Sequence, residues 1–84
     1  MLLAEVEGRV WITQEIDALQ GRTTLATKDL ASGSRQVAVD LVGAAVGDRV
    51  LVATGSPASM ALGGAAVDAV VVALVEGSDV LGSR

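Results

Sequence analysis

Residues 1–13 alternate between two kinds of side chain, and this alternation constrains the fold more strongly than any other feature of the sequence. One set of alternate positions holds apolar residues and a glycine: Leu2, Ala4, Val6, Gly8, Val10 and Ile12. The other set includes Glu5, Glu7, Arg9 and Trp11. Successive side chains of a strand point to opposite faces, so a period of two predicts a long strand with one buried face.

Four further segments have the composition of strands, and turn residues separate them. We expect strands over residues 23–28, 35–40, 49–54 and 67–76. Residues 32–34 (Ser-Gly-Ser) favour a hairpin between the first two of these, and Gly43 and Gly47 bracket a compact turn before the third. The last segment is apolar on both faces apart from Asp68. It is therefore expected to be buried on one side against the chain's own core and on the other against something else.

A short helix is predicted directly after the fourth strand. Ser56 and Pro57 follow Gly55, helix-forming residues occupy 58–62, and glycines stand at 63 and 64. The pattern favours Ser56 as the N-cap, Pro57 as the first helical residue and a glycine stop.

Five short strands, glycine turns and one short helix after the fourth strand predict an all-β fold. The fold class that fits is a small five-stranded OB-like barrel, antiparallel and partly open. The sequence shows no repeat or linker, so residues 1–84 are expected to form a single domain.

The composition disfavours several classes of function. The chain has no histidine, cysteine or tyrosine, so it lacks the usual nucleophile and base pairs, soft metal ligands and disulfides. A net charge of −4 and a single aromatic residue, Trp11, disfavour nucleic-acid binding. The longest apolar run, 69–75, is far shorter than the ~20 residues of a membrane-spanning helix. We expect a cytoplasmic protein that is not an enzyme and has no cofactor, metal, nucleic-acid or membrane partner.

The residues that could carry chemistry also have ordinary structural explanations. Glu5 and Glu7 form a carboxylate pair of the kind used in acid and base catalysis, but they also fit the solvated face of the first strand. Ser56 lies at a strand-to-helix turn without a histidine to act as its base. Three scattered aspartates offer oxygen ligands but fit turns and strand ends better: Asp40, Asp48 and Asp68.

Trp11 is the exception on the polar face of the first strand. A lone tryptophan at such a position packs under a loop or anchors a subunit contact, and the sequence supports both interpretations equally.

Three segments of the chain, in this order, resemble those of one known protein family. They are residues 39–52 (VDLVGAAVGDRVLV), 55–58 (GSPA) and 66–75 (AVDAVVVALV). The opening LAEVEGRV (3–10) and the loop LQGR (19–22) fit the same pattern. The sequence resembles the EutN/CcmL family, the pentameric vertex proteins of bacterial microcompartment shells. It departs from the family pattern at Ser59, where arginine is usual, and at Glu76, where aspartate is usual.

The resemblance implies an OB-like barrel that assembles into a cyclic homopentamer with a narrow central channel. Such pentamers would fill the fivefold corners that hexameric and trimeric shell proteins cannot close. The protein would then be a structural component of the shell. An OB-type module that binds a ligand or nucleic acid is the alternative, and an enzyme ranks third.

Two sets of residues are expected to serve this assembly. The turn at the start of the helix, with small side chains and backbone N–H groups, is the candidate channel rim: Gly55, Ser56, Pro57 and Ala58. The candidate subunit interface draws on the last strand, the glycine turn and the lone tryptophan: Trp11, Gly43, Gly47, Val67, Asp68, Val70 and Val71.

Overall fold

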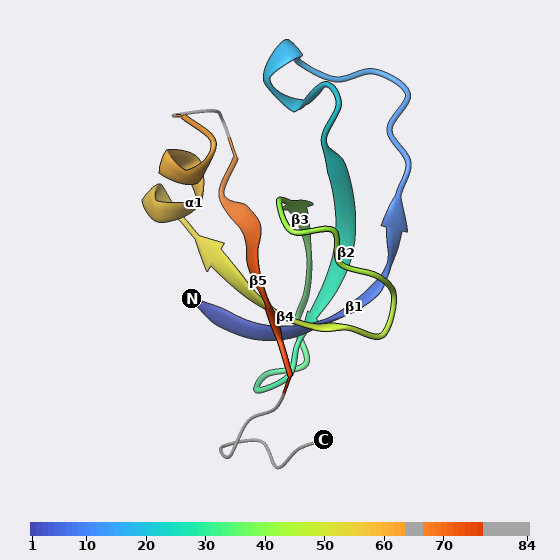
Figure 1. Ribbon diagram of the computed structural model, residues 1–84, viewed down its shortest axis with the longest axis vertical. Helices are drawn as coiled ribbons and strands as arrows, with labels where there is room; N and C mark the ends of the chain where they lie inside the picture. Colours follow the sequence, from blue (N-terminus) through green and yellow to red (C-terminus); the bar gives the residue numbers. More distant parts are fainter. Residues whose placement is uncertain (64–66, 77–84) are drawn as a thin grey trace.

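The computed structural model describes residues 1–63 and 67–76 (Figure 1). It contains the five strands β1 (Leu2–Val10), β2 (Thr23–Asp29), β3 (Arg35–Asp40), β4 (Arg49–Thr54) and β5 (Ala69–Val75). A 3-10 helix, η1 (Asp17–Leu19), lies between β1 and β2, and the helix α1 (Ser56–Ala61) follows β4. The prediction of five strands and one short helix is confirmed. The first strand ends at Val10, earlier than expected.

The strands form a closed barrel in the order β1-β2-β3-β5-β4, and β4 pairs with β1 to complete it. The sequence predicted a partly open, fully antiparallel barrel, and both details are corrected. An odd number of strands cannot alternate in direction around a closed ring, so one pairing must be parallel. That pairing joins β3 to β5 through Val39↔Val70 and Asp40↔Val71.

β1 bends because it pairs with β2 along its length and with β4 at its beginning. Its pairing with β2 shifts between Val6 and Gly8, so Glu7 is an extra residue at this point. A β-bulge of this kind increases local bending and twist, which a narrow barrel requires.

Small side chains fill the interior of the barrel. The core includes Ala4, Val6, Leu25, Ala38, Val50, Val52, Ala69 and Val71. Thr27, a polar residue, is also fully buried, and its hydroxyl donates a hydrogen bond of 3.0 Å to the carbonyl of Gln36. Valine and alanine suit an interior too narrow for aromatic rings.

A second apolar cluster lies between the barrel and α1. Val39, Ala53, Ala58 and Val70 form it, and Leu19 packs against it. The outer side of β5 is therefore covered at Val70 by the chain's own helix, and no external partner is needed there. Val70 and Val71 are both 0% exposed.

The start of α1 differs from the prediction. Gly55, not Ser56, is the N-cap, and no side chain of residues 1–63 or 67–76 caps the helix. The Gly55 carbonyl accepts hydrogen bonds from the N–H groups of Ala58 (3.1 Å) and Ser59 (3.2 Å). Gly55 has φ +66° and ψ −142°, a conformation available to glycine, which explains why the chain turns here. Gly64, expected at the helix end, lies outside the described residues.

Candidate functional site

Both members of the carboxylate pair, Glu5 and Glu7, have basic neighbours on adjacent strands. Glu7 accepts a hydrogen bond of 2.8 Å from Nε of Arg35. Glu5 lies in register between Lys28 of β2 and Arg49 of β4. Cross-strand neighbours of opposite charge are a common way to stabilise a sheet. The carboxylate pair is therefore accounted for by the outer surface of the barrel.

Two of the aspartates hold the loop between β3 and β4 in place. Asp40 accepts hydrogen bonds from the backbone N–H groups of Val42 (3.0 Å) and Ala44 (2.9 Å). Asp48 accepts one from Ala45 (2.8 Å). Within the described part of the chain, no three histidine, cysteine or acidic side chains are placed to hold a metal ion.

This loop, residues 41–48, presents apolar side chains to the solvent. Leu41, Val42 and Val46 are exposed, and Val46 is 67% exposed. The N–H of Gly47 donates a hydrogen bond of 2.8 Å to the carbonyl of Val6, which fixes the loop to β1. A loop with fixed geometry and apolar side chains is suited to contacting another protein, because it loses little conformational entropy on binding.

Trp11 lies just after the end of β1 and is 76% exposed. Its ring stacks on the guanidinium of Arg9, with Cζ 4.2 Å from the ring centroid. Of the two interpretations of this residue, packing under a loop is thereby excluded for the isolated chain.

Two hollows lie beside Trp11 and share Arg9 and Thr23 in their walls. One, of about 170 Å³, is also lined by Trp11, Ile12, Glu15 and Arg22. The other, of about 350 Å³, extends to Leu25 and the loop residues Ala44, Ala45 and Val46. Together they form an indented surface with apolar and basic groups.

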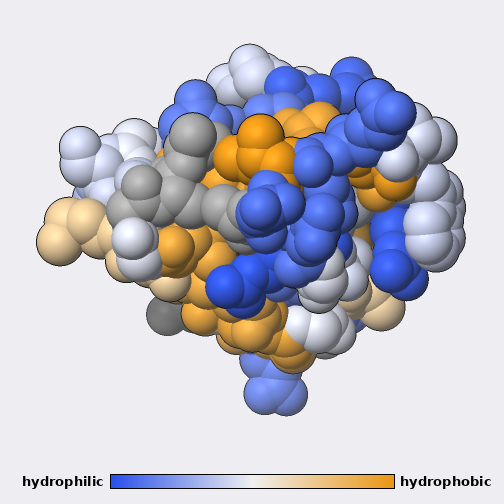
Figure 2. All heavy atoms as spheres, turned by 90° about the horizontal axis from the view of Figure 1, so that it is seen from above, coloured by the Kyte–Doolittle hydropathy of each residue, from blue (hydrophilic) through white to orange (hydrophobic). Residues whose placement is uncertain are grey.

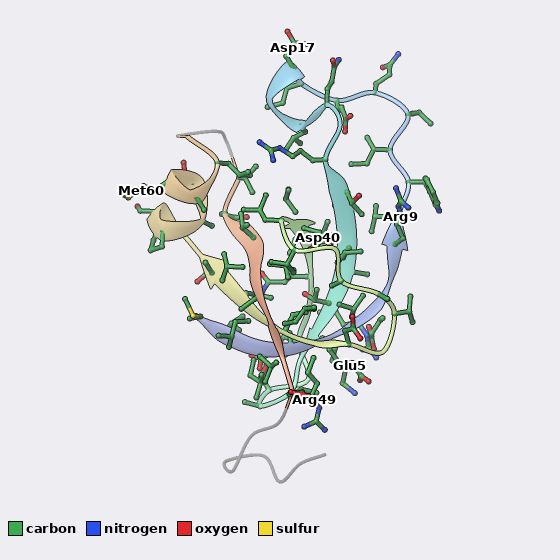
Figure 3. All side chains as sticks on the ribbon, viewed as in Figure 1. Glu5, Arg9, Asp17, Asp40, Arg49 and Met60 are labelled. Atoms are coloured by element: carbon green, nitrogen blue, oxygen red, sulfur yellow. The ribbon has the colours of Figure 1, made fainter. Side chains whose placement is uncertain are left out.

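A third hollow, of about 600 Å³, lies beside the middle of β1, at the bottom of Figure 3, where Glu5 and Arg49 are labelled. Its walls include Glu5, Asp48, Arg49, Leu74 and Glu76. Nη1 of Arg49 is buried and has no hydrogen-bond partner among the residues that the structure describes.

On the other side of the barrel, α1 exposes Met60, which is 75% exposed and points away from the barrel in Figure 3. Apolar atoms reach the surface on this side of the molecule, at the left of Figure 2, and again nearer its centre. The predicted site residues did not include Met60, because the sequence pattern of residues 58–62 indicates only a helix.

The comparison with known families decides the identity of this fold. The family model described as ethanolamine utilisation protein EutN/carboxysome matches residues 1–76. The chain belongs to the EutN/CcmL family. The resemblance seen in the sequence is thereby confirmed.

Solved structures of EutN/CcmL proteins agree closely with this one. The pentameric microcompartment shell protein GrpN from Rhodospirillum rubrum is 37% identical, with a TM-score of 0.81 over 90% of this chain and 93% of that chain. CcmL from Nostoc sp. PCC 7120 is 36% identical, with a TM-score of 0.84 over 96% and 95%. A pentameric shell protein of the RMM microcompartment is 36% identical, with a TM-score of 0.82 over 90% and 91%. Among curated proteins, no sequence matches significantly.

The EutN/CcmL assignment favours a structural protein of the shell over the OB-type binding module. Members of the family are structural shell proteins. Nothing in residues 1–63 or 67–76 forms a helix long and apolar enough to span a bilayer.

The structure brings together some of the predicted assembly residues of this EutN/CcmL chain and separates others. In the candidate rim, Gly55, Ser56 and Pro57 are exposed, whereas Ala58 is buried on the inner side of α1. In the candidate interface, Gly43 and Gly47 are exposed, as is Asp68, and Val67 is half-buried. The side chains of Val70 and Val71 lie inside the chain and are unavailable to a neighbour.

Proposed function

We propose that this protein forms a cyclic homopentamer and occupies the fivefold vertices of a bacterial microcompartment shell. The observation that carries this proposal is the family membership, together with solved relatives of 36–37% identity whose descriptions name them as pentameric shell proteins. Exposed apolar residues support it independently: Met60 lies on one side of the barrel and Trp11, which stacks on Arg9, lies on the other.

The proposed function is geometric, and we assign no catalytic step to the chain. Five identical head-to-tail contacts close into a ring when each rotates the next subunit by about 72°. A ring of this symmetry fills a corner that flat hexameric and trimeric shell proteins leave open, and so seals the compartment. These shell proteins are the proposed partners.

Within the ring, the turn at residues 55–57 is the proposed channel rim. Its side chains are small or lack charge, and the positive φ of Gly55 directs the chain sharply into α1. The proposed interface consists of Trp11, the loop between Gly43 and Gly47, Val67 and Asp68.

Native mass spectrometry at micromolar concentration tests the ring directly. The expected species has a mass of about 42 kDa, five times the 8.4 kDa of one chain. A spectrum that contains monomers or dimers alone would contradict the proposal.

Electron microscopy of shells tests the vertex role. Co-expression with hexameric shell proteins should give closed particles that contain about sixty copies of this chain, five at each of twelve corners. Omission of the chain should leave open sheets or tubes. Closed particles in its absence would show that corner closure does not depend on it.

A further inference from the structure

Two exposed apolar features of the chain lie on different sides of the barrel. We call Met60, Ala61 and Asp68 the helix surface, because Met60 and Ala61 belong to α1 and the Asp68 carbonyl accepts a hydrogen bond from the Gly55 N–H at its start (2.9 Å). We call Arg9, Trp11, Ile12, Arg22 and Val46 the Trp11 surface, because these residues line the two adjoining hollows. Figure 3 shows Met60 and Arg9 at opposite sides of the molecule.

This placement matches what a closed ring requires. In a cyclic assembly with more than two subunits, each subunit uses one surface for the preceding neighbour and a different one for the next. The helix surface and the Trp11 surface are separated by the body of the barrel.

The shapes and chemistry of the two surfaces complement each other. The helix surface projects a flexible methionine, and the Trp11 surface offers a hollow of about 170 Å³ with the indole in its wall and, beside it, one of about 350 Å³. Methionine adapts to irregular apolar spaces, and its sulfur makes favourable contacts with aromatic rings. Trp11 already uses Arg9 as one stacking partner, so the contact would complete the burial of a ring that is 76% exposed.

The charges are complementary as well. Residues 50–83 contain no lysine or arginine, and Asp68 of the helix surface is exposed. The Trp11 surface carries Arg9 and Arg22, both exposed, and Glu15 and Asp40 line the same hollows, so the complementary charges are Asp68 on one side and these two arginines on the other. Opposite charges across an interface fix its register and disfavour wrong pairings.

We propose that the helix surface of one subunit docks into the Trp11 surface of the next, with Met60 against Trp11 and Asp68 facing Arg22. This assignment rests on the proposed ring and specifies which two surfaces form each of its contacts.

Thiol cross-linking tests the pairing, because the natural chain has no cysteine. The double variant Ala61→Cys and Ile12→Cys leaves Met60 and Trp11 in place. A short bis-maleimide should then join neighbours and give a ladder up to a covalent pentamer on denaturing gels. A disulfide would demand a narrower geometry.

Matched controls make the result decisive. Each single variant should stay monomeric on the gel, because one cysteine per chain cannot connect two different surfaces. A covalent dimer from Ala61→Cys alone would overturn the proposal, since it would show two helix surfaces in contact. The pair Ala61→Cys and Val37→Cys, with Val37 exposed on β3 outside both surfaces, should give no ladder.

A charge exchange tests the polar part of the contact. Asp68→Arg and Arg22→Asp should each raise the protein concentration needed for ring formation by about tenfold, because like charges would meet. The two changes together should restore it. Ala31→Arg, in the hairpin turn, should have no effect.

The outcomes separate this proposal from the proposed function. If native mass spectrometry shows pentamers but the double cysteine variant gives no ladder, the surface pairing is wrong and the ring stands. If the unmodified chain forms no pentamer, the proposed function fails first.

Discussion

The guanidinium of Arg9 stacks on the ring of Trp11, with Cζ 4.2 Å from the ring centroid. Both residues follow the bulge in β1, and both are exposed. An exposed contact of this type contributes about 0.5–1 kcal/mol, which is enough to favour one orientation of the indole. The ring is thus oriented before any partner arrives, and its other face remains available.

Trp11→Ala should weaken the ring while leaving the isolated chain almost as stable as before. A central aromatic anchor contributes about 2 kcal/mol or more to an interface, so the dissociation constant should rise about 30-fold. The free energy of unfolding of the monomer should change by less than about 1 kcal/mol, because the side chain is exposed. Native mass spectrometry and urea denaturation measure the two effects. An unchanged ring would exclude Trp11 from the interface; Val37→Ala serves as the control.

Gly55→Ala should destabilise the fold by about 1–3 kcal/mol. No atom lies within 4 Å of the added Cβ, so the cost is one of backbone conformation and not of collision. Gly8→Ala provides the matched control: its Cβ would also meet open space, and its φ is not positive. Denaturant unfolding of both variants measures their free energies of unfolding. An equal decrease in the two variants would contradict this explanation of the turn.

Asp40→Ala should reduce the free energy of unfolding by about 1–2 kcal/mol, because two backbone N–H groups lose their acceptor. Asp48→Ala removes one such hydrogen bond and should cost less. Faster amide hydrogen exchange in residues 42–45 should accompany the first change. If exchange in this loop is unaltered, Asp40 does not hold it.

Asp29 should make the free energy of unfolding fall more steeply as the pH decreases in the acid range. Hydrogen bonds from the N–H of Ala31 and the hydroxyl of Ser32 lower its pKa below the ordinary value of 3.8. The unfolded chain therefore binds the proton more tightly, so the stabilisation is present above pH 3.8 and is lost as the pH falls through the folded-state pKa. Unfolding of the natural chain and of Asp29→Asn at several pH values measures it. The difference between their free energies of unfolding should shrink as the pH falls, and a difference independent of pH would contradict the stabilising role of Asp29. Ser32→Ala should weaken the pH dependence, because it removes one of the hydrogen bonds to Asp29.

Local patterns predicted the strands well, because alternation and glycine turns are properties of neighbouring residues. The parallel pairing of Val39 with Val70 was missed, since it depends on residues far apart in sequence. The N-cap was assigned to Ser56 because serine caps many helices, but a positive φ at Gly55 made a side-chain cap unnecessary.

The candidate site was less predictable. Alternation placed Trp11 on a strand but could not show that the strand ends at Val10 or that the ring is 76% exposed. Val70 was expected at a subunit contact because the last strand is apolar on both faces. The covering partner was α1, and composition does not distinguish a chain's own helix from a neighbour.

Closure of the barrel limits how this protein can aggregate and how its binding partners can change in evolution. Each of the five strands has a neighbour on both sides, so the described main chain leaves only short unpaired edges, such as residues 35–38 of β3, for an added strand. Growth by endless β-addition, the route to fibrils, is thereby disfavoured at the level of the backbone. Attachment to other proteins must then be encoded in side chains and loops. Mutations in these side chains and loops can therefore change the binding partner without changing the fold.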